Sequence, residues 1–205
     1  MGKIIFGFIH FSKLDKFTQN HKYKNLAANY DLLVERLYIE ENNLLNKFGF
    51  TTLESAYASK RILNPGVLKL NRITAVYGDD GFLVLGHVKG TTNLVYTAII
   101  ANINLSNKII YKNNNNSNNN KILGNGLLLS SLGINYNYRG LGYCSRILSM
   151  IIKKCSKIYK NIAIYSEILS TNTKSQKCHT NAGFIYDDNL TTLSGDDIYV
   201  YNKLN

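Results

Sequence analysis

Several residue types that mark particular classes of protein are scarce in this chain. Its 205 residues include one proline, no tryptophan and only 13 acidic residues. No apolar run reaches the length of a membrane span, so we expect no membrane association. The three cysteines (Cys144, Cys155 and Cys178) are odd in number and lack Cys-x-x-Cys spacing. We therefore expect reduced, cytosolic thiols rather than a disulfide framework or a zinc site.

The residues that are present indicate one globular domain spanning residues 1–205. Hydrophobic residues make up 45% of the chain and charged residues 18%, which is enough apolar material for a core. The net charge of +11 raises the question of a nucleic-acid partner. The lysines are spread along the chain, and its 28 asparagines suggest an AT-rich coding bias. Nucleic acid is therefore an unlikely partner.

The first third of the chain is predicted to contain one strand and two helices. Residues 1–11 are predicted to form a first strand, from residue 3 onward, rather than a signal peptide, because a basic lead-in and a cleavage site are missing. Apolar residues from Leu26 to Tyr38 repeat at helical spacing. Thr51 and Glu54 are placed to cap a further helix through Leu63. Together these elements form an N-terminal part, residues 1–70, ahead of a core at 72–201.

The core is predicted to alternate strands and helices. Residues 72–77 and 82–88 flank a Gly-Asp-Asp-Gly turn, which is typical of a hairpin. Residues 113–120 hold seven asparagines and one serine, so we expect a disordered loop there. The remaining elements expected are strands at 94–105, 108–112, 127–134, 162–169, 184–186 and 198–201, and helices at 144–159 and 173–181. This order indicates an α+β fold with a mixed sheet of six or seven strands.

A glycine-rich turn separates strand 127–134 from helix 144–159. It contains Gly140 and Gly142, and Arg139 precedes them. The first N–H groups of a helix lack intrahelical acceptors, and the helix dipole is positive at that end. A strand that turns through glycines into a helix can therefore bind phosphate. Taken alone, the turn is equally consistent with a plain tight turn.

A second motif follows the turn and indicates which kind of phosphate ligand the turn would bind. Residues 172–184 read Asn-x-x-Ser-x-x-x-His-x-x-x-Gly-Phe, and Glu167 stands five residues before Asn172. Together with Arg139-Gly140-Leu141-Gly142-Tyr143-Cys144, this pattern resembles the GCN5-related N-acetyltransferase (GNAT) superfamily. Its acetyl-CoA signature is Arg/Gln-x-x-Gly-x-Gly/Ala, which Arg139 and Gly142 match. Cys144 departs from it, because Gly or Ala is usual at that position.

The resemblance implies a fold and a cofactor site. It predicts a mostly antiparallel mixed sheet flanked by helices, in which the family's fourth and fifth strands, here 127–134 and 162–169, splay apart around the pantetheine arm of acetyl-CoA. Backbone groups of Gly133 and Ile134 would bind that arm. The turn would bind the diphosphate, with charge added by Arg139. The cofactor residues implied are Gly133, Ile134, Arg139, Gly140, Leu141, Gly142, Tyr143, Cys144, Ser145, Asn172 and Ser175. No metal is expected.

The resemblance also suggests two catalytic residues. Transfer to an amine needs a base that removes a proton, and an acid that protonates the departing thiolate is useful. Glu167 lies where related enzymes carry a base that acts through water, although an ordinary ion-paired glutamate would look the same. His179 lies four residues before the Gly183-Phe184 pair. In this family, the catalytic acid is often found at that position. It could act as that acid, bond the cofactor, or simply pack. Asn172 could position pantetheine or cap the following helix.

These features predict a cytoplasmic N-acetyltransferase that moves an acetyl group directly from acetyl-CoA to a primary amine of a small molecule or protein. The protein would be a monomer or a homodimer, and its acceptor is not identified by any motif. Four acidic residues near the C-terminus either attract a cationic amine or are solvated turn residues: Asp187, Asp188, Asp196 and Asp197. Two alternatives are a catalytically inactive acyl-CoA-binding module of the same fold and, less favoured, a basic nucleic-acid-associated protein.

Overall fold

The computed structural model describes residues 3–34, 70–112, 123–192 and 195–202. Contacts group the chain into two compact units. The first comprises Met1–Ala101 and Ser131–Arg139, and the second comprises Asn102–Ser130 and Gly140–Asn205.

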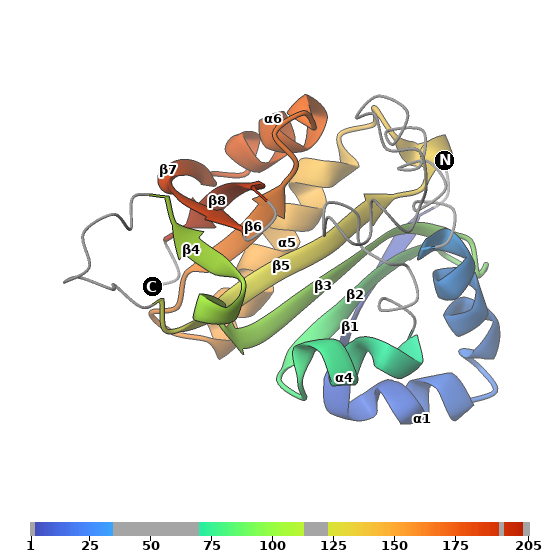
Figure 1. The fold of residues 1–205 in the computed structure, drawn as a ribbon. Helices are drawn as coiled ribbons and strands as arrows, with labels where there is room; N and C mark the ends of the chain where they lie inside the picture. The colour runs from blue at the N-terminus through green and yellow to red at the C-terminus, as the bar shows by residue number, and fades with distance from the viewer. Residues whose placement is uncertain (1–2, 35–69, 113–122, 193–194, 203–205) are drawn as a thin grey trace, which may run out of the picture. The chain divides into compact units, whose positions relative to one another are not determined.

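Three antiparallel strands form the sheet of the first unit (Figure 1). They are β1 (Ile4–His10), β2 (Gly81–Val88) and β3 (Leu94–Asn104, whose last residues belong to the second unit). Phe6, Gly86 and Tyr96 are partners across this ladder. The Tyr96 ring occupies the space that a Cβ at Gly86 would need, and it contacts the Phe6 ring at 5.6 Å between centroids. Gly86 therefore admits a large aromatic side chain to the middle of the sheet.

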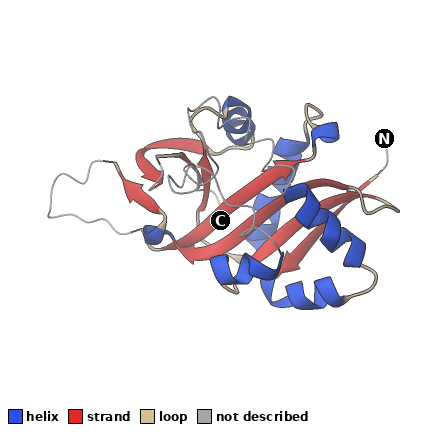
Figure 2. Ribbon diagram, turned by 45° about the vertical axis from the view of Figure 1, so that its right-hand side comes forward, coloured by secondary structure: helices blue, strands red, loops and turns tan. Residues whose placement is uncertain are grey.

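Short helices accompany these strands, and one of them corrects the sequence prediction. Residues 72–77 were expected to form a strand of a hairpin, but Ile73–Tyr77 is helix α4, drawn as a helix in Figure 2. Ile73 and Tyr77, four residues apart, are both buried, so the helix presents one apolar face to the core. Gly78 ends α4 with a left-handed φ of 76°. The Gly-Asp-Asp-Gly segment thus joins a helix to β2 rather than two strands.

Among the residues that the structure describes, the other helical segments of the first unit are η1 (Phe11–Lys13), α1 (Leu14–Gln19), residues 24–34, η3 (Leu70–Arg72) and η5 (Tyr136–Tyr138). Residues 24–34 confirm the expected helix up to that point. Helix α1 was not predicted, because its polar sequence shows few apolar positions, although Leu14 and Phe17 are buried. The rest of the predicted 26–38 helix, the predicted 51–63 helix and the asparagine-rich loop at 113–120 lie outside the described residues.

The second unit is a five-stranded mixed sheet with two helices (Figure 1). Its strand order is β5-β6-β8-β7-β4, in which only β5 and β6 are parallel. The elements are η4 (Leu105–Asn107), β4 (Ile109–Tyr111), β5 (Asn125–Ile134), α5 (Tyr143–Ile158), β6 (Ile164–Ile168), α6 (Thr173–Asn181), β7 (Ile185–Thr192) and β8 (Asp197–Tyr201). The bounds of these elements agree closely with the predicted ranges, with two exceptions. The short η4 was not predicted, and β7 is longer than expected. Strand β7 runs six residues beyond the predicted 184–186, because β4 pairs with its polar second half.

Strands β5 and β6 part after a short ladder, as the resemblance implied. Only Leu127–Leu129 of β5 pairs with Ile164–Ser166 of β6, although both strands continue. Two residues beyond that ladder, Ser131 has a left-handed φ of 56°, which is unusual for a residue with a side chain. This irregularity interrupts the regular course of β5 where the pairing ends.

Helix α5 is amphipathic. Ile147, Leu148, Ile151 and Cys155 are buried, whereas Arg146, Lys153 and Lys157 are exposed. Across the described ranges, no helix is both long enough and apolar enough to cross a membrane. The sheet of the described residues has eight strands, one or two more than the six or seven expected.

Candidate active site

The glycine turn adopts a conformation that needs its glycines. Gly140 and Gly142 have left-handed φ values of 76° and 74°. No atom outside their immediate chain neighbours lies within 4 Å of the position that a Cβ would take at either residue. The backbone is therefore bare on that side, and a bulky group of a ligand can approach it closely.

Helix α5 begins directly after the turn, with Gly142 as its N-cap. A glycine N-cap supplies no side chain, so the helix has no side-chain cap. Its first turn contains no acidic residue, and Arg146 follows. A positive helix end without an anionic side chain fits a diphosphate, which would accept hydrogen bonds from N–H groups of residues 140–145.

The prediction that all three cysteines are reduced thiols is wrong, because Cys144 forms a disulfide with Cys178. The Cα atoms of the two residues are 6.1 Å apart, and 34 positions separate them in sequence. The bridge connects the first turn of α5 with α6. Sequence spacing gave no sign of it, since only the fold brings these two helices together. Cys155 is the cysteine left as a free thiol, and burial raises its pKa to about 12.

Three predicted cofactor residues precede the turn and belong to the first unit. The Arg139 Nε–H donates to the carbonyl of Ile134 at 2.9 Å, and its guanidinium carbon lies 5.9 Å from the centre of the Tyr136 ring. Asn135 follows Gly133 and Ile134 and is tied to β3: its N–H donates to Val95 O at 2.8 Å and its amide to Leu94 O at 2.9 Å. The end of β5 is thereby held, and one carbonyl expected to face cofactor is engaged by Arg139.

Glu167 lies on β6 in an environment suited to a base. Burial raises the pKa of its carboxyl group, nearby Asp196 adds to the rise, and Lys108 opposes it. A carboxylate with a raised pKa accepts a proton more readily than an ordinary one. The chemistry expected of Glu167 is therefore compatible with its surroundings.

His179 lies in the core of the second unit, with 1% of its surface exposed. Its Nδ1 is 2.8 Å from the Ser175 carbonyl, to which it donates, and its Nε2 is 3.0 Å from the Ser166 hydroxyl, from which it accepts. The Phe184 ring packs edge-on at 5.1 Å. Burial lowers the pKa of His179, although the Ser175 carbonyl opposes this. Of the roles considered, this neutral, enclosed imidazole fits hydrogen bonding and packing better than proton donation.

The two catalytic candidates do not converge. Successive residues of a strand point to opposite faces, and Ser166 points toward His179. Glu167, the next residue, therefore points to the other face of β6. The sequence gives no signal for Ser166, because spacing along the chain does not show that its hydroxyl contacts the His179 imidazole.

Asn172 and Ser175 organise the start of α6. The Asn172 side-chain oxygen accepts from the Ser175 N–H at 3.1 Å, which confirms the capping role considered for it. Gly183 then ends the helical region with a left-handed φ of 93°. This φ favours a glycine, and a Cβ at this position would also approach the Tyr201 ring at 3.2 Å. The Asn…Gly-Phe motif thus accounts for the beginning and end of α6, and a cofactor contact from Asn172 or Ser175 stays a prediction.

Comparison with solved structures decides the fold. A GNAT-family acetyltransferase from Staphylococcus aureus is 17% identical, with a TM-score of 0.53 over 98% of this chain and 99% of that one. The chain has the GNAT fold. A GNAT-family acetyltransferase from Streptococcus agalactiae is 13% identical over 98% and 95% of the two chains, with a TM-score of 0.54. An aminoglycoside acetyltransferase in complex with coenzyme A and kanamycin is 11% identical over the same shares, with a TM-score of 0.51.

No protein-family model and no curated protein matches the sequence. The GNAT fold therefore rests on three-dimensional likeness together with the motif residues. Within the described residues, no group of three or more His, Cys, Asp or Glu side chains is arranged to hold a metal ion.

The structural role of His179 leads to a prediction about stability. His179→Ala should lower the free energy of unfolding by about 2–4 kcal/mol, because it leaves a cavity and removes partners from Ser166 and Ser175. The folded state lowers the pKa of His179, so the unfolded state binds more protons in mild acid. The wild type should therefore be most stable above the unfolded pKa of about 6.5 and lose stability as pH falls below it.

Urea unfolding at pH 7.5 and 5.5 measures both effects. His21→Ala is the control, since His21 is exposed on the first unit. A cost for His179→Ala no larger than that for His21→Ala, or an unchanged acid dependence, would contradict the buried role.

Proposed function

We propose that this protein transfers an acetyl group from acetyl-CoA to a primary amine. The observation that carries the proposal is the turn of Gly140 and Gly142, which leads into the uncapped, acid-free N-terminus of α5. Such a helix end favours a diphosphate, and it occurs at the position that the acetyl-CoA signature occupies in the GNAT fold. Acetyl-CoA would supply the reactive thioester.

The residues have separate tasks in this proposal. Backbone N–H groups of residues 140–145 bind the diphosphate, with charge from Arg139, while backbone groups of Gly133 and Ile134 bind the pantetheine arm. Glu167 removes a proton from the acceptor amine, directly or through water. The lone pair of the amine nitrogen can then attack the carbonyl carbon of the acetyl group. Asn172 caps the start of α6 through Ser175, and His179 links α6 to Ser166 on β6.

Binding without transfer is the second candidate function. It is favoured by the burial and lowered pKa of His179, which leave the motif without an evident proton donor. Direct transfer tolerates this, because a thiolate leaving group can also take its proton from water.

A panel of acceptors tests the proposal. Purified protein is incubated with acetyl-CoA and aminoglycosides, polyamines, amino acids or peptide N-termini, and released CoA thiol is measured. With at least one primary amine, CoA should be released faster than by hydrolysis without an acceptor. The rate of this release should saturate as the acetyl-CoA concentration rises. Saturable binding without release for any amine would favour the binding module, and absence of both would refute the proposed function.

A further inference from the structure

The Cys144–Cys178 disulfide lies at the helix end that the diphosphate would occupy. Cys144 is the second residue of the 16-residue helix α5, and Gly142 is its N-cap. The proposed ligand and the Cys144 sulfur therefore share the positive end of one helix dipole. The charge on the Cys144 sulfur therefore affects how tightly an anion can bind at that position.

The two sulfur atoms have different electrostatic surroundings. Cys144 is half-buried at a helix N-terminus, where a thiolate is stabilised. Cys178 is 8% exposed and three residues from the C-terminal end of α6, where the dipole disfavours a negative charge. When the bridge is opened, Cys144 is therefore the cysteine that ionises, and Cys178 stays a neutral thiol.

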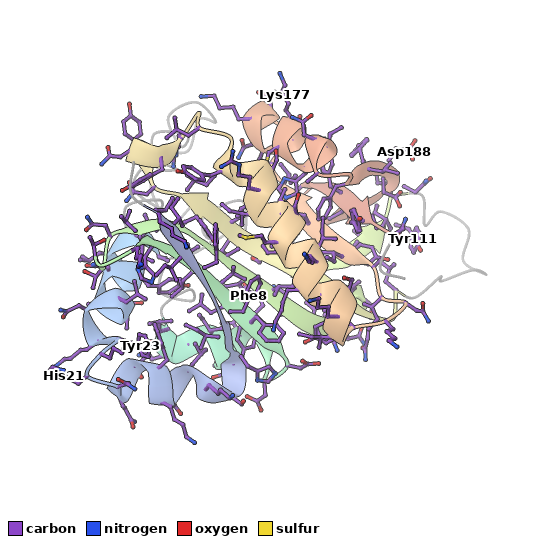
Figure 3. All side chains as sticks on the ribbon, turned by 180° about the vertical axis from the view of Figure 1, so that it is seen from behind. Phe8, His21, Tyr23, Tyr111, Lys177 and Asp188 are labelled. Carbon is purple, nitrogen blue, oxygen red and sulfur yellow. A yellow bond between two sulfur atoms is a disulfide. The ribbon has the colours of Figure 1, made fainter. Side chains whose placement is uncertain are left out.

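The titratable groups of the first turn of α5 and of α6 include no carboxylate. They are Tyr143 and Arg146 on α5 and Lys174, Lys177 and His179 on α6. The Lys177 side chain points outward from α6 (Figure 3). A thiolate at Cys144 therefore meets no anionic neighbour on either helix until a ligand diphosphate arrives.

We infer that the Cys144–Cys178 pair is a reversible oxidation site that controls acyl-CoA binding: the disulfide form binds the diphosphate, and the reduced form opposes it with a Cys144 thiolate. This inference rests on the proposed function. A dithiol reductant forms a mixed disulfide with one protein sulfur, and its second thiolate then displaces that sulfur. The protein S–S bond breaks, its two sulfurs gain two electrons and up to two protons, and the reductant leaves as its own disulfide.

Two single variants separate the thiolate from the loss of the cross-link. Cys178→Ser and Cys144→Ser both lack the bridge, but only Cys178→Ser retains a sulfur at the α5 terminus. Acetyl-CoA affinity is measured by calorimetry at pH 6.5 and 8.5 for both variants and for oxidised and reduced wild type. Thiol counts under denaturing conditions and the pH dependence of iodoacetamide alkylation report the state of each cysteine.

Oxidised wild type should show one free thiol, that of Cys155, and an affinity with little pH dependence. Reduced wild type and Cys178→Ser should lose about tenfold in affinity between pH 6.5 and 8.5, as the Cys144 thiolate forms beside the diphosphate. Cys144→Ser should show no such loss. Bound acetyl-CoA should also slow alkylation of Cys144 in Cys178→Ser.

Three results would overturn the inference. They are three free thiols in protein exposed to oxidised glutathione, equal pH dependence in the two variants, and equal affinity of the oxidised and reduced forms at pH 8.5. Each of these leaves acetyl-CoA binding itself intact. Absence of binding in every form, including oxidised wild type at pH 6.5, would instead refute the proposed function and the inference with it.

Discussion

Gly142→Glu is expected to weaken acetyl-CoA binding at least about 100-fold. The substitution places a carboxylate at the N-cap of α5, where the diphosphate is proposed to bind. Two unit charges 4 Å apart near a protein surface repel by about 4 kcal/mol, which corresponds to roughly 1000-fold in affinity. Side-chain movement relieves part of this repulsion. The left-handed φ of 74° adds strain of about 1–2 kcal/mol to the folded state for any residue with a Cβ.

The matched control is Gly90→Glu. Gly90 has a left-handed φ of 79°, and no atom lies within 4 Å of its Cβ position, so this variant introduces the same charge and similar strain in the turn between β2 and β3. Calorimetry with acetyl-CoA should show near wild-type affinity for Gly90→Glu and at least about 100-fold weaker binding for Gly142→Glu, while circular dichroism shows that both are folded. Equal affinities of the two variants would argue against a diphosphate at the α5 terminus.

Glu167→Gln is expected to reduce turnover about 100- to 1000-fold and leave the affinity for acetyl-CoA within about threefold of the wild type. Glutamine keeps the size of the side chain but cannot accept the proton. Burial raises the pKa of Glu167 more than Lys108 lowers it, and Asp196 adds to the rise, so the base ionises at a higher pH than an ordinary glutamate. Wild-type turnover should therefore rise with pH through that raised pKa, and Glu167→Gln should lose this limb of the profile.

Steady-state rates of CoA release between pH 4.5 and 9 measure the effect. Asp15→Asn on α1 is the control, because Asp15 is an exposed acid of the first unit. Loss of turnover with an unchanged pH profile would assign Glu167 a structural role. Full activity of Glu167→Gln would remove it from the mechanism.

The fold could largely be predicted from the sequence where local patterns agree with tertiary environment. Strand β5, helix α5 and helix α6 follow their apolar periodicity and capping residues closely. Helix α4 could not be predicted in this way. Its sequence, Ile-Thr-Ala-Val-Tyr, is rich in β-branched residues and precedes a strong turn signal, but burial of Ile73 and Tyr77 favours a helix. Tertiary packing outweighed local propensity there.

The candidate site was predictable in its residues and much less so in its geometry. The motifs identified the glycine turn, Glu167 and His179. Spacing in sequence cannot show that Ser166 satisfies the His179 imidazole, which leaves Glu167 on the opposite face of β6. Nor can it show that Cys144 and Cys178 meet, since this depends on the contact between two helices whose paired cysteines are 34 positions apart.

The central claim is that residues 140–145 bind the diphosphate of acetyl-CoA. A titration of oxidised, ¹⁵N-labelled protein with acetyl-CoA, followed by amide NMR, tests it most directly. The account predicts saturable shifts of the amide signals of Gly140 to Ser145, and much smaller shifts when the same signals are followed with S-acetyl-pantetheine, which lacks the diphosphate. Amide signals of residues 140–145 that stay in place while acetyl-CoA binds elsewhere, or does not bind, would contradict it.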